Sequence, residues 1–174
     1  MPTGQPGDLS YLIDSDPNAI DNSALPVTPI EDLHITGLSP SVNISDYRLN
    51  VLGLVENPLV LTYEEIKDFP NVTEVVLLIC PGTFVDNAEW TGVPVTYLLG
   101  QAGLEPDARS VTFKALDGFQ QTMALGDVQR EGVFLAYSVD GKTLPQAHGY
   151  PLRLIVKGKY GLYWLKWVTE VEIS

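Results

Sequence analysis

The sequence contains a single cysteine, few basic residues and no long apolar run. One cysteine, Cys80, excludes an internal disulfide and a zinc site made of several thiolates. Ten Lys and Arg stand against 22 Asp and Glu, giving a formal charge of -12, which argues against a broad surface for nucleic acid or anionic lipid. No stretch approaches the roughly 20 apolar residues of a membrane-spanning helix. We therefore expect a chain with no membrane span and no nucleic-acid partner.

The 174 residues, 45% of them hydrophobic, are enough for one packed core. Residues 1–28 are rich in Pro, Asp, Asn, Ser and Gly, and their apolar residues form no periodic face. We predict a flexible N-terminal tail or linker over residues 1–28 and one domain over residues 29–174. Such a tail suits a protein whose export signal or lipid anchor has been removed, although a natural flexible N-terminus explains the composition equally well.

The remaining sequence alternates strand-like runs with short helical signals. Thr62 and Glu65 have the spacing of a capping box, and Pro70 follows as a stop, so residues 61–70 favour one or two helical turns. Residues 93–104 favour a short helix punctuated by glycine. The strand-like runs are 47–55, 72–80, 109–116 and 133–139, with two more strands around a glycine-containing loop in 151–174. The pattern predicts an α+β fold that is mostly β-sheet.

The basic residues are unevenly distributed along the chain. Residues 141–169 contain no Asp or Glu, yet they hold half of the basic residues, which are Lys142, Arg153, Lys157, Lys159 and Lys166. A cationic segment in so acidic a protein indicates a confined anion site, because Arg and Lys both bind phosphate. Solvated strand and loop positions explain the same charges. Glycines in this segment, such as Gly149 and Gly161, allow backbone N–H groups to approach a ligand closely.

Cys80 lies where an apolar run meets a turn, in the stretch VVLLICPGTF. Pro81 favours extended backbone before it, so the thiol is expected at the carboxyl end of a strand, where loops line a crevice. A thiolate there is a soft ligand for a transition metal. The thiol is equally well explained as a small buried apolar side chain. Nucleophilic catalysis with His148 or His34 as the base is a third reading, with no local sequence signal for it.

Several motifs follow one another in an ordered series. They are YRLNVLGLVENPLVLTYEEI, the cysteine that ends VVLLIC, EWTGVPVTYLL, VTFKALDGF, VFLAYSVDGKTLPQAHGYPLRLIV and KYGLYWLKWV. From about residue 29 to residue 172, this series resembles the molybdopterin-binding domain of the sulfite oxidase family, including its small single-domain bacterial and archaeal oxidoreductases. Each motif is weak alone. HGYPLR followed by YG and LKW, downstream of the cysteine and EWTGVP, makes the resemblance specific.

The resemblance implies a sulfite-oxidase-type α+β fold and a pyranopterin cofactor whose dithiolene holds molybdenum, with tungsten as an alternative. Cys80 matches the cysteine that gives the metal a further sulfur ligand. Positions that hold the pterin and its phosphate are matched by Asp117, His148 and Arg153. The loop and strand that complete the pocket are matched by Tyr160, Gly161 and Lys166. Tyr160 and Asp117 are also candidates for an acid or base near the metal. The family also favours a location outside the cytoplasm.

The sequence departs from the family pattern at one point. Members that oxidise sulfite or reduce sulfoxides commonly carry Arg, Asn and His after a segment like TPIEDL, whereas this chain has Thr36, Gly37 and Leu38 there. His34 has the wrong offset and is expected to be exposed or packed. Sulfite is a dianion that needs cations, so the change argues against sulfite as the substrate. The chain also lacks the haem and dimerisation domains of larger members, which predicts a monomer with a separate redox partner such as a haem protein.

We therefore expect a small molybdenum or tungsten oxidoreductase that performs two-electron oxygen-atom transfer or reduction on a small substrate. A cofactor-holding or electron-relay module without substrate turnover is the alternative within the family. A β-rich interaction domain in which Cys80 is merely buried is a further alternative. The three tryptophans, Trp90, Trp164 and Trp167, are expected in the core.

Overall fold

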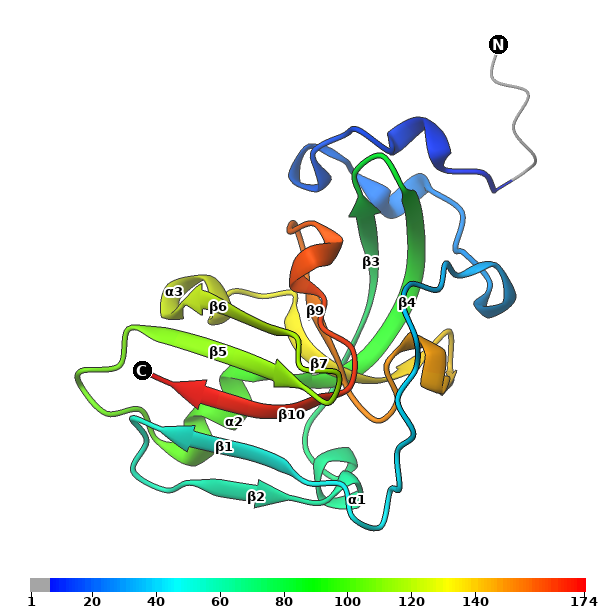
Figure 1. Cartoon of the computed structure of the whole chain (residues 1–174). Coiled ribbons are helices and arrows are strands. Elements are labelled where there is room, and N and C mark those ends of the chain that lie inside the picture. Colours follow the sequence, from blue (N-terminus) through cyan, green and yellow to red (C-terminus); the bar gives the residue numbers. More distant parts are fainter. Residues whose placement is uncertain (1–6) are drawn as a thin grey trace.

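The computed structural model describes residues 7–174 as two β-sheets with short helices between and around them (Figure 1). The first sheet has the strand order β2-β1-β10-β5-β6. β1 and β10 run parallel, and the other neighbouring pairs in this sheet are antiparallel. The strands are β1 (Leu49–Gly53), β2 (Leu59–Leu61), β5 (Ser110–Ala115), β6 (Gln120–Ala124) and β10 (Val168–Ile173).

The second sheet carries the cysteine. Its order is β3-β4-β7-β8, with β9 also paired to β7, and all its ladders are antiparallel. The long β3–β4 hairpin extends beyond the rest of the sheet in Figure 1. Its strands are β3 (Val72–Cys80) and β4 (Phe84–Pro94), and the others are β7 (Val133–Val139), β8 (Lys142–Thr143) and β9 (Arg153–Val156).

Short helices join and cover the strands. α2 packs against β1, β4 and β7, and its buried residues, Val95, Leu98, Leu99 and Ala102, belong to the main core. The α-helices are α1 (Tyr63–Lys67), α2 (Val95–Ala102) and α3 (Leu125–Val128). The 3-10 helices are η1 (Ser10–Leu12), η2 (Pro17–Ala19), η3 (Asn22–Ala24), η4 (Ile30–Asp32), η5 (Gln146–His148) and η6 (Gly161–Tyr163). Within the described residues, none of these helices is long and apolar enough to cross a lipid bilayer.

Most strand and helix predictions are confirmed. The capping box forms as predicted, because Thr62 Oγ1 accepts from the Glu65 backbone while the Glu65 carboxylate accepts from the Thr62 backbone. The three tryptophans are buried, as expected. The mostly-strand composition agrees with the predicted α+β class. β4, an 11-residue strand, was not predicted as a whole, because Asp86, Asn87 and Pro94 are residues typical of turns.

The described part of the predicted tail, residues 7–28, packs on the β3–β4 hairpin in the structure. Leu9 and Leu12 are buried against Leu77, Ile79 and Val85 on the outer face of the β3–β4 hairpin. Asp16 and Asp21 cap η2 and η3, so this polar segment forms short turns that place sparse apolar residues on the hairpin. Residues 1–6 lie outside the described residues, and the domain boundary at residue 29 stays a prediction.

Candidate functional site

Cys80 ends β3 and faces the interior of the protein. The turn after it is closed by a hydrogen bond from Thr83 N to Cys80 O of 2.9 Å. In the antiparallel register Cys80 lies opposite Phe84 and Leu78 lies opposite Asp86, so these four side chains share one face of the hairpin. We call this the inner face; the outer face carries the alternate residues under the N-terminal segment. The thiol thus lies at the carboxyl end of β3, beside the hairpin turn, and the predicted strand end is confirmed.

Gly161 lies directly against the thiol. A Cβ at this position would overlap Cys80 Sγ and lie 3.3 Å from Leu78 Cδ1, so any other residue requires the thiol or the loop to move. Burial raises the pKa of the Cys80 thiol above its usual value, the positive charge of Arg153 lowers it, and the charge of Asp86 raises it. A backbone hydrogen bond from Gly161 also lowers this pKa, because the N–H favours a thiolate. The surroundings of the sulfur therefore include one cation and one N–H donor.

Arg153 is a charged residue that lies in the interior of the protein. It starts β9, its residue is only 7% exposed, and no carboxylate of the described residues forms an ion pair with it. Its Nη1 donates to His148 O at 3.3 Å, but its buried Nε has no hydrogen-bond partner. The guanidinium carbon lies 5.2 Å from the Trp90 ring centre and 5.9 Å from that of Trp164. Burial lowers the pKa of Arg153 to about 10. A buried cation of this kind is costly without an anion.

His148 and Lys166 lie beside Arg153. Burial lowers the pKa of both, to about 8 for Lys166, and the charge of Arg153 lowers it further in each case. Gly149 permits this packing, because a Cβ there would lie 3.0 Å from Arg153 Cβ and 3.3 Å from Lys166 Cα. Lys166 Nζ donates to Thr36 O at 2.5 Å and to Ala147 O at 3.2 Å. Arg153, His148 and Lys166 thus lie together, and none of them forms an ion pair with a carboxylate of the described residues. We call these three residues the cation cluster.

The other basic residues of the acid-free segment lie outside this cluster. Lys157 pairs with Glu74, Lys159 lies over the Tyr163 ring and Lys142 is exposed. The reading as solvated or paired positions therefore holds for these three lysines. Arg153 and Lys166 lie together and remain the candidates for an anion site.

A pocket of about 270 Å³ opens beside the cation cluster. Among the predicted site residues, Asp117, Gly161 and Lys166 line it. Arg153 and His148 are buried, and Gly161 contacts both the pocket and Cys80. Tyr160 precedes Gly161, is 38% exposed and does not line the pocket. The rest of the wall comprises Thr36, Gly37, Leu38, Phe119, Leu162, Trp164, Leu165 and Trp167.

Asp117 is placed at the mouth of the pocket in a tight turn. Its Oδ1 accepts from Phe119 N at 3.1 Å, and its charge raises the pKa of Lys166. The residue is exposed, so it faces solvent as well as the pocket. A cysteine–histidine pair does not form in the described structure, because Cys80 has no hydrogen bond to His34 or to His148. The nucleophile reading of Cys80 thus has no geometric support.

Sequence reasoning missed Asp86, which is buried with 2% exposure two positions beyond Phe84. Its carboxylate accepts two hydrogen bonds from His34 and influences the pKa of Cys80, His148 and Arg153. The signal was the short hairpin turn after Cys80. Once β4 is assigned, the register places Asp86 on the same face as the cysteine.

The chain matches a known family over most of its length. Residues 36–174 match the family described as the oxidoreductase molybdopterin binding domain. The chain belongs to this family. The resemblance seen in the sequence is thereby confirmed. Among the described residues no three His, Cys, Asp or Glu side chains gather as a metal site, so Cys80 is a lone ligand candidate.

Three known proteins illustrate the relationship. A protein named "Putative protein-methionine-sulfoxide reductase subunit YedZ1" from Azospira oryzae is 32% identical over 133 residues, which cover 76% of this chain and 51% of that protein. Mitochondrial sulfite oxidase from Rattus norvegicus is 29% identical over 166 residues, covering 78% of this chain and 30% of that protein. This chain thus spans about half of the first relative and less of the second.

The fold matches a solved structure of the same kind. The crystal structure of the sulfane dehydrogenase SoxCD from Paracoccus pantotrophus superimposes with a TM-score of 0.79 and 25% identity, covering 99% of this chain and 53% of that chain. The predicted sulfite-oxidase-type α+β fold is therefore confirmed. The family of oxidoreductases and the molybdopterin-binding character of the domain are likewise confirmed.

The residues of the site fit the cofactor that the family implies. An anionic phosphate needs cations in a partly dry setting, and Arg153 Nε is buried with no partner while Lys166 lines the pocket. A metal-bearing group needs a soft donor, and the Cys80 sulfur lies against Gly161 of the pocket wall. The site therefore provides both features, from strands and loops that are far apart in the sequence.

Proposed function

We propose that this domain is a molybdopterin-dependent oxidoreductase that transfers an oxygen atom to or from a small, neutral substrate. The observation that carries the proposal is the buried, unpaired Arg153 beside the Cys80 thiol and the 270 Å³ pocket. Burying a cation costs several kcal/mol unless an anion accompanies it. A buried cation without a partner, next to the only thiol of the chain, is therefore suited to bind an anionic group that carries a metal.

Each residue would have a distinct role in holding the cofactor. Arg153 would bind its phosphate through Nε–H and the other N–H groups at the edge of its guanidinium, and Lys166 would add a second positive charge from the pocket wall. His148 would remain neutral near pH 7, because burial and two cations lower its pKa. Cys80 would supply one sulfur ligand to the metal. When bound, the cofactor supplies two-electron oxygen-atom chemistry.

The pocket wall favours a neutral substrate with apolar groups. Leu38 and Leu162 line the pocket and remain 93% and 66% exposed, and the segment Thr36–Leu38 contributes no charged side chain. A dianion such as sulfite would meet fewer cations here than a site with an arginine in that segment. A small neutral oxo compound fits this wall, and we propose an organic sulfoxide because the name of the Azospira relative refers to methionine sulfoxide. Its reduction consumes two electrons and two protons and releases the sulfide and water.

A second function within the family is a cofactor-holding or electron-relay module. The same uncharged segment, Thr36–Leu38, supports it, because a site without substrate-binding cations can hold a cofactor without turnover. In both cases we propose a separate redox partner, such as a haem protein, a monomeric chain and a location outside the cytoplasm. Molybdenum and tungsten are both compatible with a cysteine ligand.

The test begins with the cofactor. The full chain is expressed in a host that makes molybdopterin, and metal content and released fluorescent pterin are measured for the wild type, Cys80→Ser and Thr83→Ala. The wild type should contain about one metal and one pterin per chain. Cys80→Ser should lose most of the metal, and Thr83→Ala, an exposed change in the same turn, should behave as the wild type. A wild type without metal or pterin would contradict the proposal.

Turnover then separates the two functions. Loaded protein is given dimethyl sulfoxide or methionine sulfoxide with a reduced artificial donor, and separately sulfite with an artificial acceptor. Sulfoxide reduction that exceeds sulfite oxidation supports the enzyme with a neutral substrate. Full metal and pterin content without turnover of any oxo compound supports the relay module instead.

A further inference from the structure

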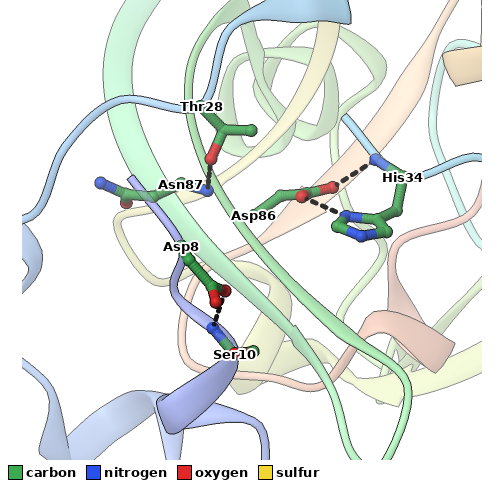
Figure 2. A network of polar contacts seen from close by, with 6 residues as sticks. All are labelled: Asp8, Ser10, Thr28, His34, Asp86 and Asn87. Atoms are coloured by element: carbon green, nitrogen blue, oxygen red, sulfur yellow. Dashed lines mark hydrogen bonds and ion pairs between the residues drawn. The ribbon is translucent and has the colours of Figure 1, made fainter. Parts of the chain in front are cut away.

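Asp86 binds one residue with both of its carboxylate oxygens. Figure 2 shows this carboxylate on β4 facing His34. Oδ2 accepts from the His34 backbone N–H at 2.9 Å, and Oδ1 lies 2.7 Å from ring Nδ1. The Asp86 side chain is 3% exposed, whereas the His34 side chain is 54% exposed. A buried carboxylate on the inner face therefore holds a surface residue from a distant part of the chain.

His34 has one further attachment. Its ring stacks on Phe84 with centres 4.7 Å apart and planes 11° from parallel. Phe84 and Asp86 are alternate residues on the same face of β4, so one strand supplies the carboxylate and the stacking surface together. Two hydrogen bonds and a stacked ring fix both the backbone and the side chain of His34, which makes this position a clasp between its segment and β4.

The segment after His34 has few attachments of its own. In the described structure residues 35–40 take part in two hydrogen bonds, from Lys166 Nζ to Thr36 O at 2.5 Å and from Gln146 Nε2 to Pro40 O. Ile35 is 60% exposed and Leu38 is 93% exposed, so apolar packing does not hold the segment. At its start the segment follows Leu33, which is buried in the main core, and the clasp at His34. Beyond His34 its position depends on these two side-chain donors.

This weakly attached segment is a wall of the pocket that we propose as the ligand site. Thr36, Gly37 and Leu38 line the 270 Å³ pocket, while His34 and Asp86 do not. The wall contacts Lys166 through a backbone carbonyl rather than a side chain, so the position of Thr36 O depends on where the backbone is held. The clasp lies two residues before Thr36, and the family match begins at residue 36.

We propose that Asp86 and His34 form a clasp that positions the pocket wall Thr36–Leu38 and, through Thr36 O, the ammonium group of Lys166. Both are positioning residues, since neither touches the pocket. The inference rests on the proposed function only in taking this pocket as the ligand site. Loss of the clasp loosens the wall and leaves the two sheets intact, because His34 lies at the surface and outside both sheets.

Limited proteolysis of the full chain tests the clasp without requiring any cofactor. The variants are His34→Ala, which removes the ring; His34→Asn, whose side-chain nitrogen occupies the position of Nδ1; and Ile35→Ala, a similarly exposed neighbour. Chymotrypsin and thermolysin cleavage within residues 35–40 is followed by mass spectrometry. We expect about tenfold faster cleavage in His34→Ala, with His34→Asn and Ile35→Ala within about twofold of the wild type. Far-ultraviolet circular dichroism should be unchanged in all three.

A double-mutant cycle separates the pair from either residue alone. Asp86→Ala should accelerate cleavage of the same segment, and adding His34→Ala should cause little further change, because the two side chains act through one another. Wild-type cleavage in His34→Ala would overturn the proposal. So would a His34→Asn variant that is cleaved as fast as His34→Ala, or independent, additive effects of the two alanine variants.

Cofactor release supplies a readout linked to the pocket. In loaded protein, His34→Ala should release fluorescent pterin about tenfold faster than the wild type, and His34→Asn should restore slow release. If cleavage is faster but the rate of pterin release is unchanged, the proposal that the clasp positions the pocket wall is overturned. If no preparation contains pterin, the proposed function fails, while the proteolysis cycle still decides whether the clasp positions the wall.

Discussion

The two faces of the β3–β4 hairpin differ although they are made of alternate residues of the same strands. On the outer face, Leu77, Ile79 and Val85 pack against Leu9 and Leu12 of the N-terminal segment. Near the turn, the groups at the inner face are a thiol, a buried carboxylate and a guanidinium without an ion pair among the described residues, those of Cys80, Asp86 and Arg153. One face is closed by apolar contacts, and the other leaves polar groups without full partners.

The outer face of the hairpin stabilises the fold, whereas the inner face carries the groups that we propose for function. Burying a leucine or isoleucine side chain contributes roughly 1.5–3 kcal/mol, so the outer face stabilises the hairpin at the level of ordinary core packing. An unpaired buried cation costs several kcal/mol, so the inner face lowers stability until an anion is bound. Residues 7–28 thus pack on the outer face of β3, the strand that carries Cys80. On the inner face, the groups that we propose to hold a ligand remain unpaired.

The largest expected effect comes from placing a side chain in the space beside the Cys80 thiol. In Gly161→Ala the new methyl group overlaps Cys80 Sγ, so either the thiol or the loop must move. We expect metal and pterin content to fall at least tenfold. Gly100→Ala is the control, because Gly100 lies in α2 with free space around its Cα, and this variant should keep its cofactor. Full cofactor content in Gly161→Ala would show that the sulfur need not lie at this position.

The next effect tests the outer face. Leu12→Ala removes a side chain that is buried in the hairpin cluster, and we expect the free energy of unfolding to fall by about 2–3 kcal/mol. Its neighbour Tyr11 is 62% exposed, so Tyr11→Ala should change the free energy by less than about 0.5 kcal/mol. Urea unfolding measures both. Equal, negligible effects would mean that the segment behaves as the tail that its composition predicted.

Arg153→Met tests the cost of the unpaired cation. In the protein without cofactor, the free energy of unfolding should rise by about 1 kcal/mol, because the variant replaces an uncompensated buried charge with an apolar side chain. The same variant should lose pterin from loaded protein. Arg130 is exposed, and Arg130→Met should change neither quantity appreciably. A marked loss of stability in Arg153→Met without cofactor would contradict the contrast between the faces.

The smallest effect is a pH dependence caused by Lys166. Burial lowers its pKa in the folded protein to about 8, below the unfolded value near 10.4. Between about pH 8 and pH 10 the unfolded chain therefore binds a proton that the folded chain has released, so stability rises with pH. For this partly exposed group we expect a change on the order of 1 kcal/mol. Urea unfolding at pH 7.5 and 9.5 should show this rise in the wild type, and a smaller one in Lys166→Met.

Local signals predicted much of the fold. The Cys-Pro-Gly sequence after an apolar run located the end of β3, and Thr62 with Glu65 located the start of α1. β4 was missed because its polar residues acquire partners only in the folded chain, such as the hydrogen bond between Thr28 and Asn87 in Figure 2. Neighbouring segments thus override the low strand propensity of these residues.

The site was predicted in composition but not in arrangement. The absence of acids around Arg153 and Lys166 made an anion site one of two interpretations of this segment, the other being solvated positions. The contact between Gly161 and Cys80, the clasp of Asp86 and His34, and the pairing of Lys157 with Glu74 depend on long-range register. Spacing along the chain carries no signal for such contacts, because each joins segments more than 50 residues apart.

The central claim is that the Cys80 sulfur binds the metal of a cofactor anchored by the neighbouring cations. X-ray absorption spectroscopy of loaded protein at the metal edge counts the sulfur ligands directly, in the wild type and in whatever metal Cys80→Ser retains. The account predicts one metal–sulfur ligand fewer in Cys80→Ser, with the pterin still present in that fraction. An equal number of sulfur ligands in the two proteins would contradict it.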